Sequence, residues 1–412
     1  MRILILTQYY APEVGAAQVR LAALARELGE AGHTVEVVTG MPNHPEGVVR
    51  PGYRRRIRMT ETVDGVPVHR VWLYAASGSG IRRVLNYLSF TVTCLLALVT
   101  RRRPDVIFVE SPPPFLMVPA VMVGFVWRRP IAMNIADLWP DSATGLGLLE
   151  EDSRTTRVLL AFERWAYRRA RWVCAVTDGV REVLENDKSV PAHRLVDLPN
   201  GVDTALFTPR PGDRSVLRPW GLEDRRVLLY AGTVGYAHGV DTAVDAMLEI
   251  HDTHPDVHLL IVGGGSMWDA VAERVDQTGA ANVTVARPVP LEVVADLLDV
   301  TEAAVSTLRD SPLFEGTRPS KLFPAFAAAV PVLYSGAGEG ARIVADNDVG
   351  LVTPPEDAAA LAAAARQLLD DPELASRLGA NGRRLAVDRF SWATIVQDWL
   401  AQLQRQDERA QS

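Results

Sequence analysis

The 412-residue sequence contains only two cysteines, Cys94 and Cys174, which excludes a fold held by a disulfide framework and favours a reducing compartment such as the cytoplasm. Its eight histidines form no cluster with the spacing of zinc ligands, so a zinc site is not indicated. The N-terminal stretch "MRILILTQYYAPE" has too short an apolar run for a signal peptide and no small-residue cleavage site. We therefore expect it to form a buried first strand.

The apolar stretch "VLNYLSFTVTCLLALVT" (residues 84–100) falls short of the roughly 20 residues that a membrane-spanning helix needs, and it contains polar side chains. The favoured interpretation is a helix that packs on the core ahead of the strand "DVIFVE". The alternative is a helix that lies on a membrane surface. Arginines at 82–83, 101–103 and 128–129 would then face anionic head groups, and this peripheral contact would weaken at high salt.

The net charge of −7 is distributed unevenly along the chain. Residues 1–200 carry 25 Lys and Arg against 20 Asp and Glu, whereas residues 201–412 carry 18 against 30. This asymmetry indicates two domains with different partners, although ordinary surface charge accounts for it equally well. We expect no nucleic-acid partner.

Short apolar runs alternate with longer helical patterns along the whole chain, which is typical of an α/β fold with doubly wound parallel sheets. The pattern occurs twice, and a Pro/Gly/Asp-rich stretch, "DLPNGVDTALFTPRPGDRS", separates the two halves. We predict two Rossmann-like domains facing a cleft, with an Asp64-Gly65 hairpin inserted in the first. The predicted boundaries are 1–203 for the first domain, 204–388 for the second, and 389–412 for a C-terminal amphipathic helix that packs back towards the first domain.

Loops at the carboxyl ends of the predicted strands are candidate ligand sites, because ligands of open α/β sheets bind beyond these ends. Small residues there let a ligand approach backbone N–H groups. None of these loops matches G-x-G-x-x-G or a P-loop, and each alone is more often a tight turn. The donor-binding candidates in these loops are Gly15, Ala16, Gly232, Thr233, His238, Gly264 and Arg287, and Ser320 is a further candidate later in the chain.

The stretch "FEGTRPSKLFPAF" carries the strongest signal. Pro324 fits only the first turn of a helix, so the helix should begin near Ser320 or Lys321. A helix start attracts an anion, and Arg318 and Lys321 add charge that suits a diphosphate. Glu315 would instead accept hydrogen bonds from hydroxyl groups, and a ligand with both features is a nucleotide sugar. The alternative is a surface salt bridge between Glu315 and Arg318.

The segments "YYAPEVGAAQVRLAALARELGEAGHTVEVVTGMPNHPEG", "DLWPDS", "NGVD", "YAGTVGYAHGVD", "RPSKLF" and "AVPVLYSGAGEG" together resemble the GT-B glycosyltransferases of family 4. They are most similar to its bacterial branch of N-acetylhexosamine and deoxy-hexosamine transferases of surface-polysaccharide synthesis. The resemblance runs nearly end to end. It implies transfer of a sugar from a nucleoside diphosphate with retention of configuration and without a metal ion. The donor would bind mainly to the second domain and the acceptor to the first.

The resemblance to the family is partial at the level of single residues. Many relatives carry a Glu-x7-Glu motif, in which Glu315 is similar to the first Glu, displaced by one, while the second falls on Pro324. Ribose recognition would then pass to Glu339. Thr233 and His238 occupy the places where many relatives hold the diphosphate with an Arg and a Lys, so that work is expected of Arg318 and Lys321.

Asp137 in "NIADLWPDS" stands near the place where the family commonly has a His, so it is a candidate to orient the acceptor. A helix-capping aspartate is the alternative. Asp137 and Glu315 are therefore the two catalytic candidates. The segment "DND" (346–348) lacks a third ligand nearby and is expected to be a solvated turn, so no metal site is predicted.

These features lead to the hypothesis of a retaining transferase that moves a sugar, such as GlcNAc, from a UDP-sugar to a hydroxyl or phosphate acceptor without a cofactor. The acceptor is a sugar, a lipid-linked molecule or a small molecule, and the enzyme is expected in the cytoplasm or at the inner face of the membrane. A UDP-sugar 2-epimerase of related fold and a non-catalytic nucleotide-sugar-binding subunit are the alternatives.

Overall fold

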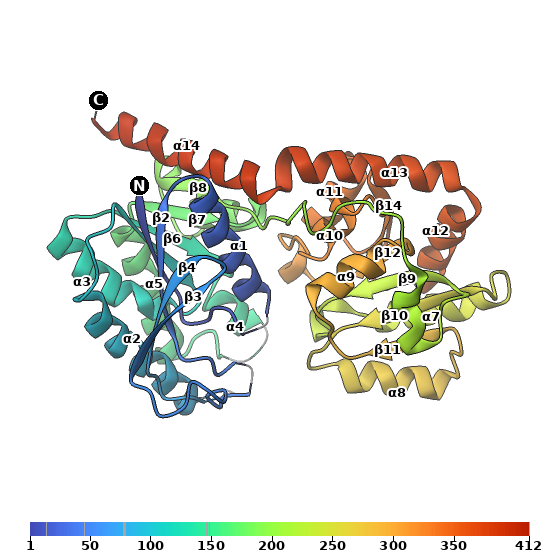
Figure 1. Cartoon of the computed structure of the whole chain (residues 1–412), viewed down its shortest axis with the longest axis horizontal. Coiled ribbons are helices and arrows are strands. Elements are labelled where there is room, and N and C mark those ends of the chain that lie inside the picture. The colour runs from blue at the N-terminus through green and yellow to red at the C-terminus, as the bar shows by residue number, and fades with distance from the viewer. Residues whose placement is uncertain (14, 45, 77–79, 146, 148, 412) are drawn as a thin grey trace. The chain divides into compact units, whose positions relative to one another are not determined.

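The computed structural model describes the whole chain except residues 14, 45, 77–79, 146, 148 and 412 (Figure 1). The chain divides into two compact units. Unit 1 comprises residues 1–200 and 395–412, and unit 2 comprises residues 201–394. Each unit has its own β-sheet, with helices packed against it.

The sheet of unit 1 has eight strands in the order β3-β4-β2-β1-β5-β6-β7-β8. Its inner strands are almost continuously apolar and buried, as a parallel sheet covered on both faces requires. The strands are β1 (Arg2–Leu6), β2 (Thr34–Gly40), β3 (Arg58–Val63), β4 (Val66–Val71), β5 (Val106–Ser111), β6 (Ile131–Ile135), β7 (Trp172–Ala175) and β8 (Leu195–Asp197).

The hairpin predicted at Asp64-Gly65 is confirmed. β3 and β4 pair antiparallel, and the two turn residues have φ of 49° and 78°. Positive φ at both central positions is the geometry of a tight hairpin turn, which Asp-Gly tolerates well. The other strand pairs of this sheet are parallel.

Residues 84–100 fall largely within a single helix, α2. Its buried stripe is Asn86, Phe90, Cys94 and Leu98, spaced four residues apart, so the helix packs on the core as the favoured interpretation predicted. None of the described helices is long and apolar enough to cross a bilayer. The helices of unit 1 are α1 (Ala16–Glu30), α2 (Ile81–Leu98), α3 (Met117–Trp127), α4 (Asp141–Gly145), α5 (Arg154–Arg169) and α6 (Asp178–Asn186), with short 3-10 turns η1 (Pro114–Leu116) and η2 (Ala192–Arg194).

The sheet of unit 2 has six parallel strands in the order β11-β10-β9-β12-β13-β14. Alternate residues of β9 enter different hydrophobic clusters, since Val227 and Leu229 pack in one and Leu228 and Tyr230 in the other. Both faces are therefore covered, as in a doubly wound fold. The strands are β9 (Arg226–Ala231), β10 (Val257–Val262), β11 (Val283–Ala286), β12 (Thr301–Thr307), β13 (Val332–Ser335) and β14 (Gly350–Thr353).

The helices of unit 2 connect and cover these strands. The last helix of the chain, α14, begins in unit 2 and ends in unit 1, where Trp399 meets Phe108 edge-on at 5.8 Å between ring centroids. The helical elements are η3 (Arg214–Trp220), η4 (Tyr236–His238), α7 (Asp241–His251), α8 (Trp268–Thr278), α9 (Leu291–Leu298), η5 (Pro312–Phe314), α10 (Leu322–Ala327), α11 (Gly338–Asp346), α12 (Ala358–Asp370), α13 (Pro372–Leu385), the π-helical turn η6 (Ala386–Phe390) and α14 (Trp392–Gln411).

The strand order of each sheet reverses at one point. In unit 1 the reversal lies between β1 and β5, and in unit 2 it lies between β9 and β12. Loops leaving the carboxyl ends of neighbouring strands diverge at such a point, which opens a crevice for a ligand. Any site at the carboxyl edge is therefore expected next to β1 and β5 in unit 1, and next to β9 and β12 in unit 2.

Candidate active site

Several predicted donor-binding residues of unit 2 meet at its switch point. Gly232 and Thr233 follow β9, and His238 ends the next turn, η4. Lys321, just ahead of α10, reaches the same place, because its Cε lies 3.1 Å from where a Cβ on Gly232 would be. A side chain at position 232 would therefore crowd the lysine.

Lys321 carries its charge in largely buried surroundings. Its Nζ donates a hydrogen bond to the hydroxyl of Tyr230 and lies 3.9 Å from the centre of the Tyr230 ring. No carboxylate of the described residues forms an ion pair with it. Burial lowers the pKa of Lys321 from 10.5 to about 7. An anion bound beside it would restore the full charge at neutral pH.

His238 is adjacent to this lysine and stays neutral. Burial, and then the charge of Lys321, lower the pKa of His238 from 6.5 to about 4. Its Nδ1 is buried without a hydrogen-bond partner in the described part of the chain. The Thr307 hydroxyl donates to the backbone oxygen of His238, which ties η4 to the end of β12. His238 can therefore hydrogen-bond a ligand, but it does not replace a cation.

Arg318 forms a buried ion pair with Glu339, the predicted ribose-binding residue. The side chains are 10% and 5% exposed, and the guanidinium also lies 5.7 Å from the centre of the Phe390 ring. The alternative of a surface salt bridge to Glu315 is wrong, because the partner of Arg318 comes from α11, 21 residues further along the chain. Two of the predicted donor-binding side chains, Arg318 and Glu339, are thus paired with each other.

Glu315 lies beside the start of α11, and its own side chain is exposed. Its backbone oxygen accepts a hydrogen bond of 2.7 Å from the N–H of Glu339. Gly338 has a φ of 72°, and a Cβ there would come within 2.2 Å of the Glu315 oxygen. This close packing fixes the backbone of Glu315 while leaving its carboxylate accessible.

The predicted helix start near Ser320 or Lys321 is displaced slightly, since α10 begins at Leu322 and has only six residues. Pro324 lies in its first turn, as expected. Ser320 is exposed in the turn just before the helix. Such a short helix provides little dipole, so the local positive charge comes mainly from the side chain of Lys321.

The two remaining candidates of unit 2 lie further along the sheet. Gly264 follows β10, and a Cβ there would meet Pro288 at 3.2 Å. Arg287 follows the edge strand β11 and stacks over Trp268, with its guanidinium carbon 3.5 Å from the ring centre. β10 separates β11 from β9, and the structure records no contact between Arg287 and Lys321. Arg287 is therefore outside the cluster at the switch point.

In unit 1, Gly15 and Ala16 open α1 after the first strand, as predicted. Asp137 follows β6 and is exposed, and its Oδ2 accepts a hydrogen bond of 2.9 Å from the hydroxyl of Ser142. This hydrogen bond comes from a side chain and not from the backbone of α4. It therefore differs from the helix cap considered as the alternative.

Sequence reasoning missed a set of buried polar groups at the carboxyl edge of unit 1. Glu13 accepts backbone N–H groups of Asn43 and His44, both at 2.7 Å, and burial raises the pKa of its carboxyl despite these hydrogen bonds. At the end of β5, Glu110 pairs with Arg20. The polar segment "MPNHPEG" directly after β2 was the available signal for the first group.

Tyr230 was also missed, although it is the direct partner of Lys321. Its hydroxyl donates a hydrogen bond of 2.6 Å to the backbone oxygen of Thr233, so it shapes the loop after β9 as well. The only sequence signal was an aromatic residue with a hydroxyl group just before Ala231-Gly232 at a strand end.

Both units match known families. Residues 15–201 match the glycosyl transferase 4-like domain, and residues 217–385 match the glycosyl transferases group 1. A GDP-mannose-dependent alpha-(1-6)-phosphatidylinositol monomannoside mannosyltransferase of Mycobacterium tuberculosis is 30% identical over 72% of this chain and 83% of that protein. For the protein of the same description from Mycolicibacterium smegmatis, identity is 32%, and the match spans about half of each protein, 50% of this chain and 54% of the relative.

Solved structures share the fold at lower identity. Sucrose-phosphate synthase from Thermosynechococcus elongatus superposes with a TM-score of 0.73 at 22% identity, covering 99% of each chain. The Anabaena protein HepE, in complex with UDP-glucose, superposes with a TM-score of 0.72 at 18% identity, covering 98% of this chain and all of that one. The predicted fold, GT-B with two parallel α/β domains, is confirmed, and the chain belongs to the glycosyltransferases, with a glycosyl transferase 4-like domain followed by a glycosyl transferases group 1 domain.

Proposed function

We propose that the protein is a retaining glycosyltransferase that moves an N-acetylhexosamine, such as GlcNAc, from a UDP-sugar to a hydroxyl or phosphate acceptor. The observation that carries this proposal is Lys321. A lysine without a carboxylate partner among the described residues stands beside Gly232, in the loop after β9 at the switch point of unit 2. An anionic ligand at that point is the simplest reason for its burial.

The diphosphate of the donor would bind to Lys321, with Arg318 as the second cation. The backbone at Thr233 would approach the ligand closely, because Gly232 before it carries no side chain, while the N–H of Gly232 itself donates a hydrogen bond to the backbone oxygen of Val262. The similar Anabaena protein is described in complex with UDP-glucose, which supports a uridine nucleotide as the carrier of the donor sugar.

Glu315 would accept hydrogen bonds from hydroxyl groups of the donor sugar, and Glu339 from those of the ribose. Glu339 already pairs with Arg318, so ribose and diphosphate recognition would be coupled through this ion pair. His238 would donate or accept one hydrogen bond as a neutral imidazole. Asp137, an exposed carboxylate of unit 1, would orient the acceptor.

No metal ion takes part in the proposed reaction. In the part of the chain that the structure describes, no group of three His, Cys, Asp or Glu side chains is arranged to hold one. The charge that develops on the leaving diphosphate would be stabilised by Lys321 and Arg318, which are fixed before the reaction.

The mannosyltransferase relatives make GDP-mannose the competing donor. The enzyme should be incubated with UDP-GlcNAc or GDP-mannose, alone and with candidate acceptors. We expect UDP release and a glycosylated product only when an acceptor is present. Release of GDP from GDP-mannose, in place of UDP from UDP-GlcNAc, would show that GDP-mannose is the donor. Formation of a 2-epimer without acceptor would favour the epimerase. Absence of turnover with either donor would favour a binding subunit.

The acceptor is proposed to be a sugar, a lipid-linked molecule or a small molecule, and the place of action is the cytoplasm or the inner face of the membrane. A lipid-linked acceptor is favoured by the relatives named for phosphatidylinositol monomannoside. An enzyme for such an acceptor must work at a bilayer surface.

A further inference from the structure

Helix α2 exposes an apolar stripe on the side opposite its buried stripe. Leu85, Leu88, Val92 and Leu96 are exposed, and Val99 follows just beyond the helix end. Positions separated by three or four residues lie on one side of a helix, so these side chains form one continuous stripe. In the described part of unit 1 nothing covers this stripe, which is unusual for a helix that already has a buried face.

The neighbouring helix α3 extends this apolar surface. Phe125 is 84% exposed and Val126 is 75% exposed, close to the C-terminal end of the helix. The ends of α2 and α3 are tied together, because Arg103 donates a hydrogen bond of 2.6 Å to the backbone oxygen of Trp127. Both helices lead into strands, β5 and β6, so the exposed ends lie at the amino edge of the sheet. This edge is opposite the candidate active site of unit 1.

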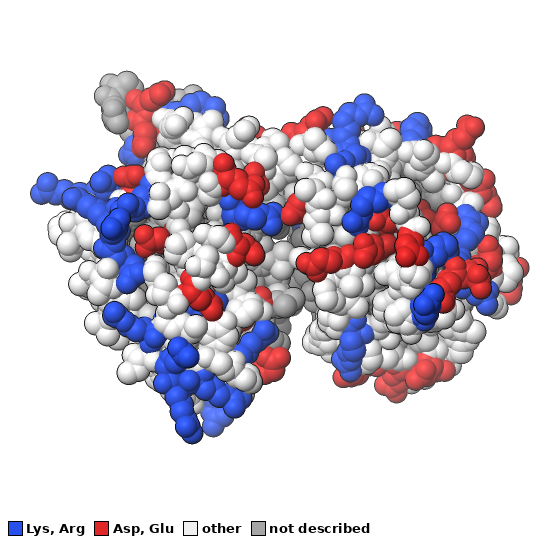
Figure 2. All heavy atoms as spheres, viewed as in Figure 1, with Lys and Arg blue, Asp and Glu red and all other residues white. Residues whose placement is uncertain are grey.

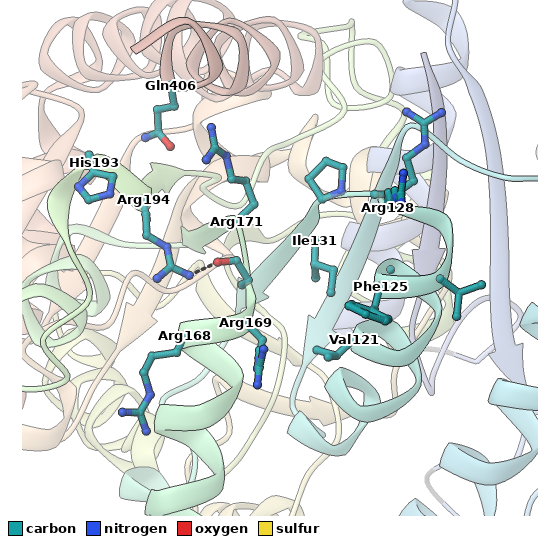
Figure 3. A pocket seen from close by; sticks show the side chains of 15 residues that line it. Val121, Phe125, Arg128, Ile131, Arg168, Arg169, Arg171, His193, Arg194 and Gln406 are labelled. Atoms are coloured by element: carbon teal, nitrogen blue, oxygen red, sulfur yellow. Dashed lines mark hydrogen bonds between the residues drawn. The ribbon is translucent and has the colours of Figure 1, made fainter. Parts of the chain in front are cut away.

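A pocket of about 1080 Å³ opens beside the end of α3. Its walls come from α3, the start of β6, the end of α5, and η2. Figure 3 shows Phe125, Val121 and Ile131 on one side of the pocket and the arginines of α5 and its surroundings on the other. The arginines that line it are Arg128, Arg129, Arg168, Arg169, Arg171 and Arg194.

This pocket has little negative charge of its own. Arg171 pairs with Asp407 at 3.0 Å, and Arg129 approaches Asp105 at 3.6 Å. Within the described chain, the other arginines of the pocket have no carboxylate partner. Burial, and then the charge of Arg171, lower the pKa of the Arg194 guanidinium. Lys and Arg side chains also gather at the left-hand border of unit 1 in Figure 2, close to the position of α3 in Figure 1.

We infer that this face of unit 1, made of the apolar stripe of α2, Phe125 and Val126 of α3, and the arginine pocket, docks on an anionic phospholipid bilayer. Arginine binds phosphate groups through paired hydrogen bonds, so the pocket suits lipid head groups. The exposed apolar side chains would enter the boundary between head groups and acyl chains. The inference rests on the proposed function in one respect, since a lipid-linked acceptor is the reason for the enzyme to bind a bilayer.

The test is co-sedimentation of the whole protein with vesicles, one set of phosphatidylglycerol mixed with phosphatidylcholine and one of phosphatidylcholine alone. We expect binding to the anionic vesicles at low salt and about tenfold weaker binding when the ionic strength is raised to about 0.5 M. Binding to the neutral vesicles should be at least about tenfold weaker than to the anionic ones.

Two variants locate the binding face. Phe125→Ser should weaken vesicle binding about fivefold, because it removes an exposed anchor. The double substitution Arg128→Ser with Arg169→Ser should weaken it at least about tenfold, since each arginine near an anionic surface changes binding about fivefold. Arg218→Ser and Leu248→Ser, on exposed positions of unit 2, are the matched controls and should bind as the wild type does.

Equal binding to neutral vesicles, no binding at low salt, or unchanged binding of both face variants would overturn the inference. Concentration-dependent dimerisation without lipid that Phe125→Ser abolishes would also overturn it, because the face would then contact a second copy of the chain. UDP binding is measured on the same samples. Its proposed diphosphate ligands, Lys321 and Arg318, are in unit 2 and are not substituted in any of these variants, so failure of the donor site and failure of the docking face give separate results.

Discussion

Lys321 is one of only two lysines in a chain rich in arginine, and its surroundings differ sharply from those of the other. Lys188 makes ion pairs with Asp141 at 2.6 Å and with Glu163 at 2.9 Å. Lys321 instead has a tyrosine hydroxyl and a neutral histidine beside it. A lysine can lose its proton near neutral pH and regain it when an anion binds, whereas arginine cannot.

We predict that Lys188 and Lys321 titrate at widely different pH values. Reductive ¹³C-methylation gives one NMR signal for each lysine, and the signal of Lys321 should titrate near pH 7, while Lys188, whose pKa is raised by its carboxylate partners, should titrate above its ordinary value. The unfolded chain keeps the Lys321 proton up to about its ordinary 10.5. The unfolded state therefore binds more protons between about pH 7 and 10.5, and stability should rise with pH across this window. A Lys321 signal that titrates together with that of Lys188 would contradict the account.

The Arg318–Glu339 pair gives a second prediction at this scale. Arg318→Ala would remove the cation that pairs with the buried carboxylate of Glu339, so the free energy of unfolding should fall by about 3 kcal/mol in urea titrations. The double variant with Glu339→Gln should recover much of that loss, because the uncompensated charge is removed as well. Equal destabilisation by the single and double variants would show that loss of the Arg318–Glu339 ion pair does not cause the fall in unfolding free energy.

At the scale of elements, most strands were predictable because they are short, nearly continuous apolar runs, whereas β3 in the hairpin is partly exposed and was predicted from its Asp64-Gly65 turn. The first strand expected in "MRILILTQYYAPE" is observed as β1, and the strand expected at "DVIFVE" is observed as β5. β8 was not predicted, since its three residues "LVD" give too short a pattern. The pairing of Arg318 with Glu339 was not predictable either, because α10 and β13 lie between the two residues in the sequence.

Helix α2 shows why the alternatives for residues 84–100 could not be separated from sequence alone. The stretch is apolar on both sides, so periodicity does not distinguish a core helix from a surface helix. The structure shows a buried stripe through Phe90 and an exposed apolar stripe through Val92 on the same helix. The packing prediction is confirmed, and the membrane contact remains a proposal.

The start of α11 gives a prediction for a loop. Gly338→Ala would place a Cβ 2.2 Å from the backbone oxygen of Glu315 at a φ of 72°, so the loop must shift. We expect a loss of about 2–3 kcal/mol of unfolding free energy together with a lower turnover of donor. Gly279→Ala is the matched control, because its φ of 64° is similar but no atom lies within 4 Å of the added Cβ. The control should lose about 1 kcal/mol and no turnover. Equal effects of the two substitutions would exclude close packing at Gly338 as the cause.

For the whole molecule, the cations of the protein alone neutralise the diphosphate in the proposed reaction. Activity with UDP-GlcNAc and an acceptor should therefore survive treatment with EDTA, because the proposed reaction has no step that depends on a bound metal. The measurement is the rate of UDP release before and after chelation. Loss of turnover that Mg²⁺ or Mn²⁺ restores would show that the positive charge of unit 2 is insufficient.

The central claim is that Lys321 binds the diphosphate of a uridine nucleotide, and calorimetric titration with UDP tests it most directly. The wild type should bind UDP more weakly as the pH rises from about 7 to 9, because Lys321 loses its proton there while the UDP phosphates are already ionised. Lys321→Ala should lower the affinity by about 1.5–3 kcal/mol and remove this pH dependence, whereas Lys188→Ala should retain it. Unchanged UDP affinity in Lys321→Ala, with the same dependence on pH as the wild type, would contradict the account.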